Sequence, residues 1–207
     1  MPPRKCREGK GLSNSLWSGN RPGTDEEAKS RLCEAALECL IRHGFEKTSM
    51  SDIAKEAGIA RPTLYKHFKS KADILIAAID WQAFRFAEAV MQHARQFDTI
   101  EKRICETIIY VVIELPKHRY LSLVLKGECY EVLRARAFSD EATEIFSTMT
   151  SAPLIEIRPD LKDKEVELSE IMSRFAISLI QFPGKYAGDH DALEALIKRR
   201  LLPGLLR

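Results

Sequence analysis

The sequence predicts an all-α protein with a small N-terminal domain and a larger helical domain behind it. Apolar residues recur at spacings of three and four along most of the 207-residue chain. Ser/Thr-x-x-Asp/Glu patterns, which are typical of helix starts, precede several of these stretches. No segment alternates apolar and polar residues over the length of a strand. These three observations together indicate helices and no sheet.

Composition narrows the classes of protein to consider. The chain is 45% hydrophobic, which is ordinary for a protein with a buried core. Its net charge is only +2, so a nucleic-acid-binding surface would have to come from a local basic excess. The longest uncharged apolar run, IIYVVI, is far shorter than the roughly 20 residues of a membrane span. The five cysteines form no C-x-x-C pair, so we expect a reduced, cytoplasmic protein.

The N-terminal segment and the first helix are distinguished by composition. Residues 1–23 are rich in Gly, Ser, Pro and basic side chains and hold few residues to bury. We therefore expect them to form a disordered basic arm. Thr24 and Glu27 form a capping-box pattern that predicts the first helix, and Gly44 is placed to end it in the left-handed conformation.

A helix-turn-helix is predicted next. Ser49 and Asp52 form a second capping-box pattern, and Gly58 supplies the positive φ that ends this helix and turns the chain. A second short helix follows, in which Leu64 and Phe68 lie four apart and face inward. Two short helices joined by a tight glycine turn are typical of DNA-binding modules.

The surface of this motif is basic. Residues 47–71 contain six lysines and arginines against two acids, in a chain that is nearly neutral. The outward residues of the second helix include no acid and one exposed aromatic residue, Tyr65. Such a helix can enter the major groove of DNA, with its first residues on base edges and its flanks on phosphates. The alternative is a plain helical hairpin with a solvated charged face.

Further helices are predicted over most of the remaining chain. A Ser-x-x-Asp pattern at 70–73 begins a long helix that is apolar on all sides and therefore expected to be buried. Another helix follows Asp98 and ends before Pro116, and shorter helices are expected near 119–136 and 139–150. The later boundaries are a linker marked by Pro153 and Pro159 and a final break at Pro203-Gly204.

The stretch GFEKTSMSDIAKEAGIARPTLYKHFKSKADIL resembles the DNA-binding domain of the TetR (tetracycline-repressor-like) family of bacterial transcription regulators. The resemblance runs from about Thr24 to Ile79. It implies a helix-turn-helix DNA-binding domain at 24–70 and an effector-binding and dimerisation domain at 71–207. The matching positions are Gly44-Phe45, Thr48, Ile53-Ala54, Ala57-Gly58, Thr63-Leu64-Tyr65, His67-Phe68 and Lys71.

The resemblance also implies roles for individual residues. The segment 61–67 would be the recognition helix, with phosphates held by Tyr65 and Lys71 and at the start of the preceding helix by Ser49. Ser51 stands where many members have arginine, which puts a cationic contact there in doubt. His67 either contacts DNA or packs over the turn. The predicted DNA-binding residues are Ser49, Ser51, Arg61, Pro62, Thr63, Tyr65, Lys66, His67 and Lys71, with Arg61, Pro62 and Thr63 facing bases.

For the second domain, the resemblance implies a small-molecule effector and a homodimer that binds palindromic double-stranded DNA. The predicted effector-binding residues are Trp81, Tyr110, Glu128, Cys129, Tyr130 and Phe175, which combine aromatic surface with a few polar groups. The predicted dimer interface is Leu168, Met172, Phe175, Leu179, Leu193, Leu196 and Ile197. The alternative for each of these residues is a place in the core of a single chain.

Two functions of other classes compete with a ligand-controlled repressor. One is an all-α enzyme that uses the helix-turn-helix as a docking module. The sequence has no nucleophile–base signature, no glycine-rich phosphate loop and no zinc-ligand spacing, so no enzymatic activity, cofactor or metal is expected. The other is a redox-sensing regulator that acts through Cys105 or Cys129, although a thiol in an apolar helix is usually inert.

Overall fold

The computed structural model describes residues 25–125, 139 and 150–206, and every regular element in these residues is a helix. The prediction of an all-α fold is therefore confirmed for the described part of the chain. The expected basic arm at 1–23 and most of the two helices expected between 119 and 150 lie outside the described residues. The chain divides into two compact units, with a boundary between Gln82 and Ala83.

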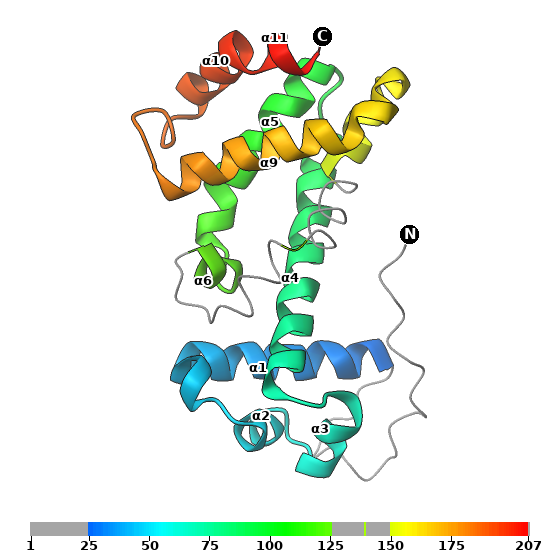
Figure 1. Cartoon of the computed structure of the whole chain (residues 1–207), viewed down its shortest axis with the longest axis vertical. Coiled ribbons are helices and arrows are strands. Elements are labelled where there is room, and N and C mark those ends of the chain that lie inside the picture. Colours follow the sequence, from blue (N-terminus) through cyan, green and yellow to red (C-terminus); the bar gives the residue numbers. More distant parts are fainter. Residues whose placement is uncertain (1–24, 126–138, 140–149, 207) are drawn as a thin grey trace. The chain divides into compact units, whose positions relative to one another are not determined.

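The described part of the first unit contains three helices and the start of a fourth (Figure 1). These helices are α1 (Asp25–Lys47), α2 (Met50–Glu56), α3 (Arg61–His67) and the beginning of α4 (Lys71–Ala94). Helix α2 packs against both α1 and α3. The predicted boundary at 70/71 coincides with the start of α4, whereas the two compact units divide twelve residues further along this helix.

Local signals position the helix-turn-helix as the sequence suggests. Ser49 and Asp52 form a reciprocal capping box at the start of α2. Gly44 and Gly58 have φ values of 73° and 68°, a left-handed conformation that only glycine adopts without strain. Between the two short helices, Ile53 and Leu64 are fully buried. These side chains anchor α2 and α3, so the exposed face of α3 is held on a packed support.

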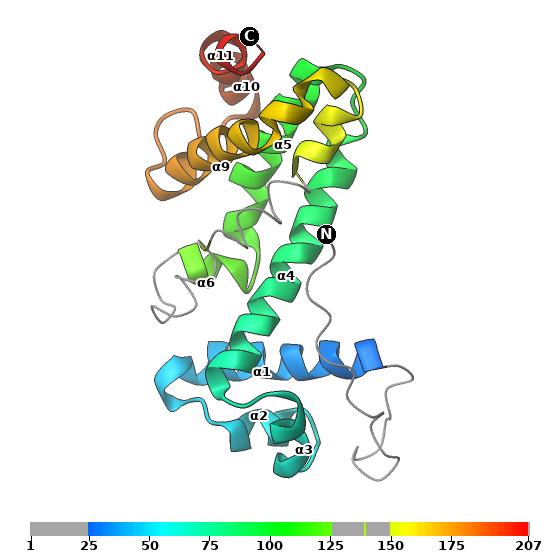
Figure 2. The same cartoon turned by 45° about the vertical axis from the view of Figure 1, so that its right-hand side comes forward.

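The second unit is organised around α5 (Ile100–Glu114). Helices α9 (Glu165–Gln181) and α10 (His190–Arg200) both pack against α5, and the views in Figures 1 and 2 show α9 crossing it. Its other elements are the part of α4 from Ala83 onward, η1 (Leu115–Lys117), α6 (Leu121–Leu125), η2 (Pro159–Lys164) and α11 (Leu202–Leu205).

Three local expectations were wrong. Residues 150–155 are helical and Pro153 is buried, so the expected linker is confined to the residues just before Pro159. Phe84 is 37% exposed, so α4 is not buried on every side. Pro203 lies in the first turn of α11, where a missing N–H is tolerated, instead of ending a helix. Among the described residues, no helix combines the length and the apolar character needed to cross a membrane.

Candidate nucleic-acid interface

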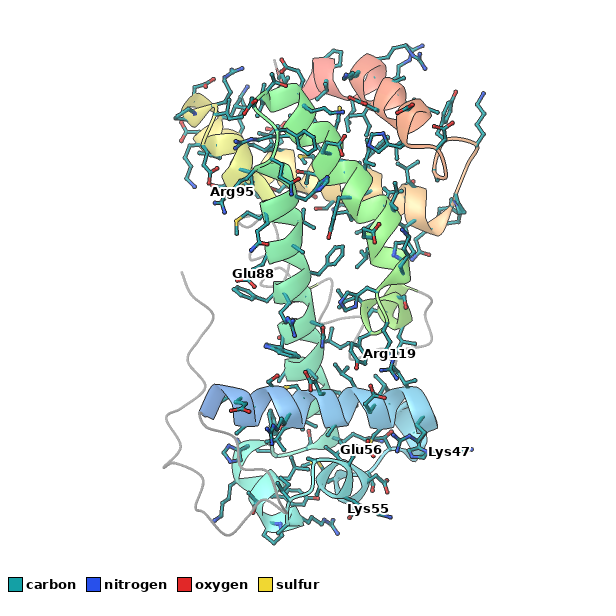
Figure 3. The ribbon with its side chains drawn as sticks, turned by 180° about the vertical axis from the view of Figure 1, so that it is seen from behind. Lys47, Lys55, Glu56, Glu88, Arg95 and Arg119 are labelled. Carbon is teal, nitrogen blue, oxygen red and sulfur yellow. The ribbon has the colours of Figure 1, made fainter. Side chains whose placement is uncertain are left out.

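The two acids within the basic segment 47–71 are both engaged in local contacts. Arg42 donates two hydrogen bonds to the Glu56 carboxylate, at 2.9 and 3.1 Å, and these bonds lower the pKa of Glu56. The Ser49 hydroxyl and backbone likewise lower the pKa of Asp52. Lys55 is exposed beside Glu56 on α2 (Figure 3). Both acids therefore stay ionised, and the charge of Glu56 is balanced by Arg42.

The exposed face of α3 carries a preorganised pair of side chains. The Arg61 guanidinium donates a 3.2 Å hydrogen bond to the Tyr65 hydroxyl and lies 5.4 Å from the centre of the Tyr65 ring. Tyr65 is 43% exposed. Pro62 and Lys66 are exposed on the same helix, while His67 is half-buried in its last turn. Positive charge and an aromatic hydroxyl are thus presented together, as phosphate and base contacts require.

Thr63 does not lie where the sequence predicted. Its residue surface is only 2% exposed, because Thr63 and Leu64 form the buried side of α3. Thr63 was expected on the outward face of this helix, and that placement was wrong; its predicted base contact stays a prediction. Helical periodicity explains the error: a seven-residue helix has too few turns for its faces to be assigned by spacing alone.

Ser49 also makes contacts other than the predicted phosphate contact. Its hydroxyl lies 2.6 Å from the Asp52 carboxylate and accepts a hydrogen bond from the Asp52 backbone N–H. Its own backbone N–H donates to the same carboxylate at 2.9 Å. The donors that were expected to meet a phosphate therefore cap α2 instead. The neighbouring Ser51 is exposed.

Lys71 connects two helices of the first unit. Its ammonium donates to the Phe45 carbonyl at 2.6 Å and lies 3.5 Å from the Glu46 carbonyl, at the end of α1. It also lies 4.2 Å from the centre of the Phe45 ring. These contacts satisfy carbonyl groups at a helix C-terminus, where a cation is favourable. The described position of Lys71 thus has a structural role that sequence reasoning missed.

Comparison with known proteins shows what the helix-turn-helix region is similar to. The family "Bacterial regulatory proteins, tetR family" matches residues 32–78, which include α2 and α3. Residues 32–78 are therefore similar to this family of regulators. The TetR match ends within α4.

The first curated relatives align over about two fifths of this chain. The fatty acid metabolism regulator protein of Bacillus subtilis is 31% identical over 78 residues, and the transcriptional activator FasR of Mycolicibacterium smegmatis is 32% identical over 80 residues. These alignments cover 38% and 37% of this chain, and the chain spans only 40% and 36% of the length of these two relatives. A putative mycofactocin biosynthesis regulator of Mycobacterium tuberculosis is 27% identical over 172 residues, which cover 68% of this chain and 83% of the relative.

Solved structures extend the fold similarity over both units. The repressor AlkX of Dietzia, a TetR-family protein implicated in biodegradation of n-alkanes, has a TM-score of 0.65 at 20% identity over 90% of this chain and 98% of its own. FadR of Bacillus subtilis, solved in complex with stearoyl-CoA, has a TM-score of 0.57 at 20% identity over 81% of this chain and 96% of its own. At such identities the similarity is one of fold.

The residues predicted to bind an effector are not brought into one described site. Tyr110 lies on α5 with its ring 4.7 Å from that of His93, whereas Phe175 is half-buried on α9. Trp81 belongs to the other unit. Glu128, Cys129 and Tyr130 lie outside the described residues. A surface hollow of about 530 Å³ elsewhere in the second unit is lined by Glu101, Lys198, Leu202, Pro203 and Leu206 and contains none of the predicted residues.

Four of the predicted dimer-interface residues belong to the core of a single chain. Leu168 and Met172 on α9 are 2% and 4% exposed, and Leu193 and Ile197 on α10 are fully buried. They face inward because α9 and α10 both pack against α5. In the single chain these four residues form part of its core, and their role in a dimer interface stays a prediction. The other three residues, Phe175, Leu179 and Leu196, are half-buried.

Sequence reasoning also missed a polar network around Glu106, a carboxylate that is only 4% exposed on α5. Burial raises the pKa of Glu106, but hydrogen bonds from Lys102, His93 and His190 outweigh this effect and bring it below its usual value. Lys102 and then Lys198 lower the pKa of Glu194 to about 2.

Proposed function

We propose that this protein is a transcription regulator that binds double-stranded DNA by placing α3 in the major groove. The observation that carries the proposal is the exposed Arg61–Tyr65 pair on a helix whose opposite side is buried. The match of residues 32–78 to the TetR family supports the same assignment. Arg61 and Pro62 occupy the first turn of α3, the part of a recognition helix that meets base edges. Tyr65 and Lys66 supply phosphate contacts further along the helix.

We further propose that the regulator acts as a homodimer on a palindromic operator. A seven-residue recognition helix provides limited contact, and two copies on one duplex join two half-sites. The apolar surface left exposed by one chain supports self-association. Ile171 on α9 is 38% exposed, Val166 is 66% exposed and Phe182, just beyond α9, is 82% exposed. The dimer surface is therefore assigned to the outer side of α9 instead of the buried stripe.

A small-molecule effector is proposed to release the repressor from its operator. An effector shifts the equilibrium only by its difference in affinity between the DNA-binding state and the released state. The relatives in the comparisons include both a named activator and named repressors. Because sequence similarity to the first curated relatives is confined to about two fifths of this chain, the effectors of those proteins are not assigned to it.

The proposal is tested by selecting bound duplexes from a random DNA library and measuring their affinity by fluorescence anisotropy. Arg61→Ala should reduce discrimination by about 1–3 kcal/mol for each base pair it contacts, because the guanidinium binds a base edge. Tyr65→Phe should weaken selected and random DNA alike. Lys185→Ala, an exposed substitution in the second unit, is the matched control and should bind as the wild type does.

Salt and mass measurements complete this test. Affinity should fall by roughly 10³ or more between 50 and 200 mM salt if a dimer makes about six phosphate contacts. Light scattering should give twice the 23.5 kDa mass of the chain. Recovery of no enriched sequence, together with equal binding by wild type, Arg61→Ala and Tyr65→Phe, would show that α3 is not a recognition helix.

A further inference from the structure

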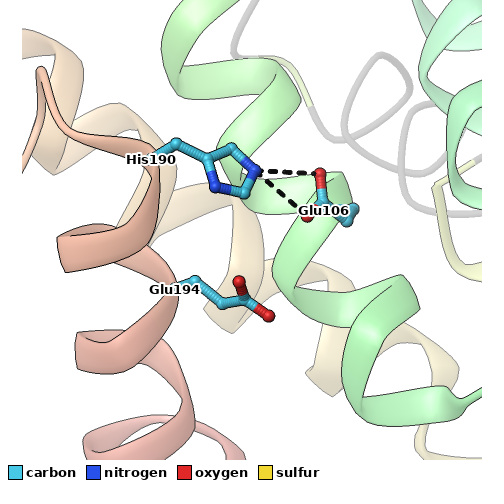
Figure 4. A group of neighbouring side chains, drawn as sticks. All are labelled: Glu106, His190 and Glu194. Atoms are coloured by element: carbon cyan, nitrogen blue, oxygen red, sulfur yellow. Dashed lines mark hydrogen bonds and ion pairs between the residues drawn. The ribbon is translucent and has the colours of Figure 1, made fainter.

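The polar network of the second unit contains three side chains with the donor types of a metal site. Glu106 on α5 and His190 and Glu194 on α10 each offer an atom, and these atoms lie within 4.8 Å of one another (Figure 4). The His190 Nε2 is 3.1 Å from one oxygen of Glu106 and 3.4 Å from the other. His190 and Glu194 are four residues apart and therefore lie on one face of α10.

This cluster needs positive charge between its two carboxylates. Glu106 is 4% exposed, and a buried carboxylate is costly unless a cation offsets it. Lys102 occupies that role, at 3.0 Å from Glu106 and 2.9 Å from Glu194. Its side chain is 33% exposed and has a flexible stem, so the ammonium can move into solvent when another cation takes its place. Glu194 keeps a second partner, Lys198, at 2.8 Å.

The second ring nitrogen of His190 has the partner that metal-binding histidines use. The His190 Nδ1 lies 3.2 Å from a carboxylate oxygen of Asp191. When Nδ1 carries the hydrogen and donates it to this oxygen, the lone pair of Nε2 points at Glu106. In the metal-free protein a hydrogen on Nε2 fills this place by donating to Glu106, and a metal ion would replace that hydrogen. A carboxylate behind the histidine also orients the ring for a metal and raises its basicity.

We propose that Glu106, His190 and Glu194 bind a divalent transition metal of the zinc class, which displaces the Lys102 ammonium. One imidazole nitrogen and two carboxylates suit Zn²⁺, which accepts nitrogen and oxygen ligands and leaves a fourth position for water. Mg²⁺ and Ca²⁺ favour sets made of oxygen alone. From the opposite side, His93 on α4 lies 3.2 Å from Glu106 and steadies that carboxylate. Metal binding would join α5 to α10.

The experiment titrates Zn²⁺ into the full, chelator-stripped chain by calorimetry at constant pH. Wild type should bind one tight equivalent. His190→Ala and the isosteric Glu194→Gln should each weaken this binding by about tenfold or more, because each removes a ligand. His43→Ala is the matched control, since His43 is an exposed histidine of the first unit and should leave binding unchanged. Circular dichroism of each variant verifies that it folds.

Lys102→Met provides the decisive variant. If the ammonium and the metal compete for the same carboxylates, removing the ammonium should tighten Zn²⁺ binding even as it destabilises the metal-free protein. Co²⁺ in place of Zn²⁺ should give visible absorption in wild type and Lys102→Met but not in His190→Ala. The proposal is overturned if Zn²⁺ binding is unchanged in both His190→Ala and Glu194→Gln, or if Lys102→Met binds more weakly than wild type.

Discussion

Replacing the Lys71 ammonium should destabilise the first unit, and the contacts of this group give the size of the effect. The perturbation is Lys71→Met, which keeps the aliphatic stem and removes only the charged group. A hydrogen bond from a charged donor contributes about 1.5–3 kcal/mol, and the ring contact with Phe45 adds about 0.5 kcal/mol. Because Lys71 is half-buried, the lower end applies, and the expected loss is about 2 kcal/mol. For a chain of this size, that lowers Tm by roughly 4–8 °C.

The matched control for this prediction is Lys66→Met, an exposed position on α3 that should change Tm little. Thermal unfolding followed by circular dichroism measures both variants, and hydrogen exchange at the end of α1 locates the loss. DNA binding is then compared at a temperature where both remain folded. Lys66→Met should reduce the salt slope by about one phosphate contact. An unchanged Tm for Lys71→Met would refute the structural role assigned to its ammonium.

The remaining predictions concern two other ionisable groups. Cys105 is fully buried, and burial raises the pKa of its thiol to about 11, so it should resist alkylation in the folded chain and react only after unfolding. Mass spectrometry of the labelled peptide measures this, and rapid native labelling would revive a redox role for Cys105. Hydrogen bonds from Arg95, and to a smaller extent Arg103, lower the pKa of Glu156. The ionised Glu156 carboxylate should therefore stabilise the fold at pH values above its pKa in the unfolded chain. This stabilisation should be lost as the pH falls through the lower pKa that Glu156 has in the folded chain. Glu156→Gln should therefore be less stable than wild type near neutral pH by under about 1 kcal/mol, with the difference vanishing in acid, and a difference that persists there would contradict this linkage.

The helix-turn-helix could be predicted because its determinants are close together in the sequence. A capping box joins residues three apart, as in Ser49 and Asp52, and a left-handed turn depends on the absence of a side chain at Gly58 alone. Such signals depend on residues that are neighbours along the chain. The segment that matches the TetR family, residues 32–78, contains both of these local signals.

Assigning the face of each side chain was less successful, because burial depends on distant packing. The sequence shows the apolar stripes that contain Leu168 on α9 and Leu193 on α10. Only the packing of these two helices on α5 decides that the stripes lie inside one chain. Thr63 shows the same limitation over a single turn, since a short helix presents a buried and an exposed side within a few residues.

By itself, the sequence determined that this protein is helical, where the two short helices of its helix-turn-helix begin and end, and that this segment is rich in basic residues. The tertiary structure decided which polar groups already form hydrogen bonds or ion pairs within the chain. The ammonium of Lys71 reaches a carbonyl 26 residues away, and Glu106 meets His190 across 84 residues. The physical reason is that caps and turns are set by neighbours along the chain, whereas hydrogen bonds and ion pairs between helices depend on how the whole unit folds.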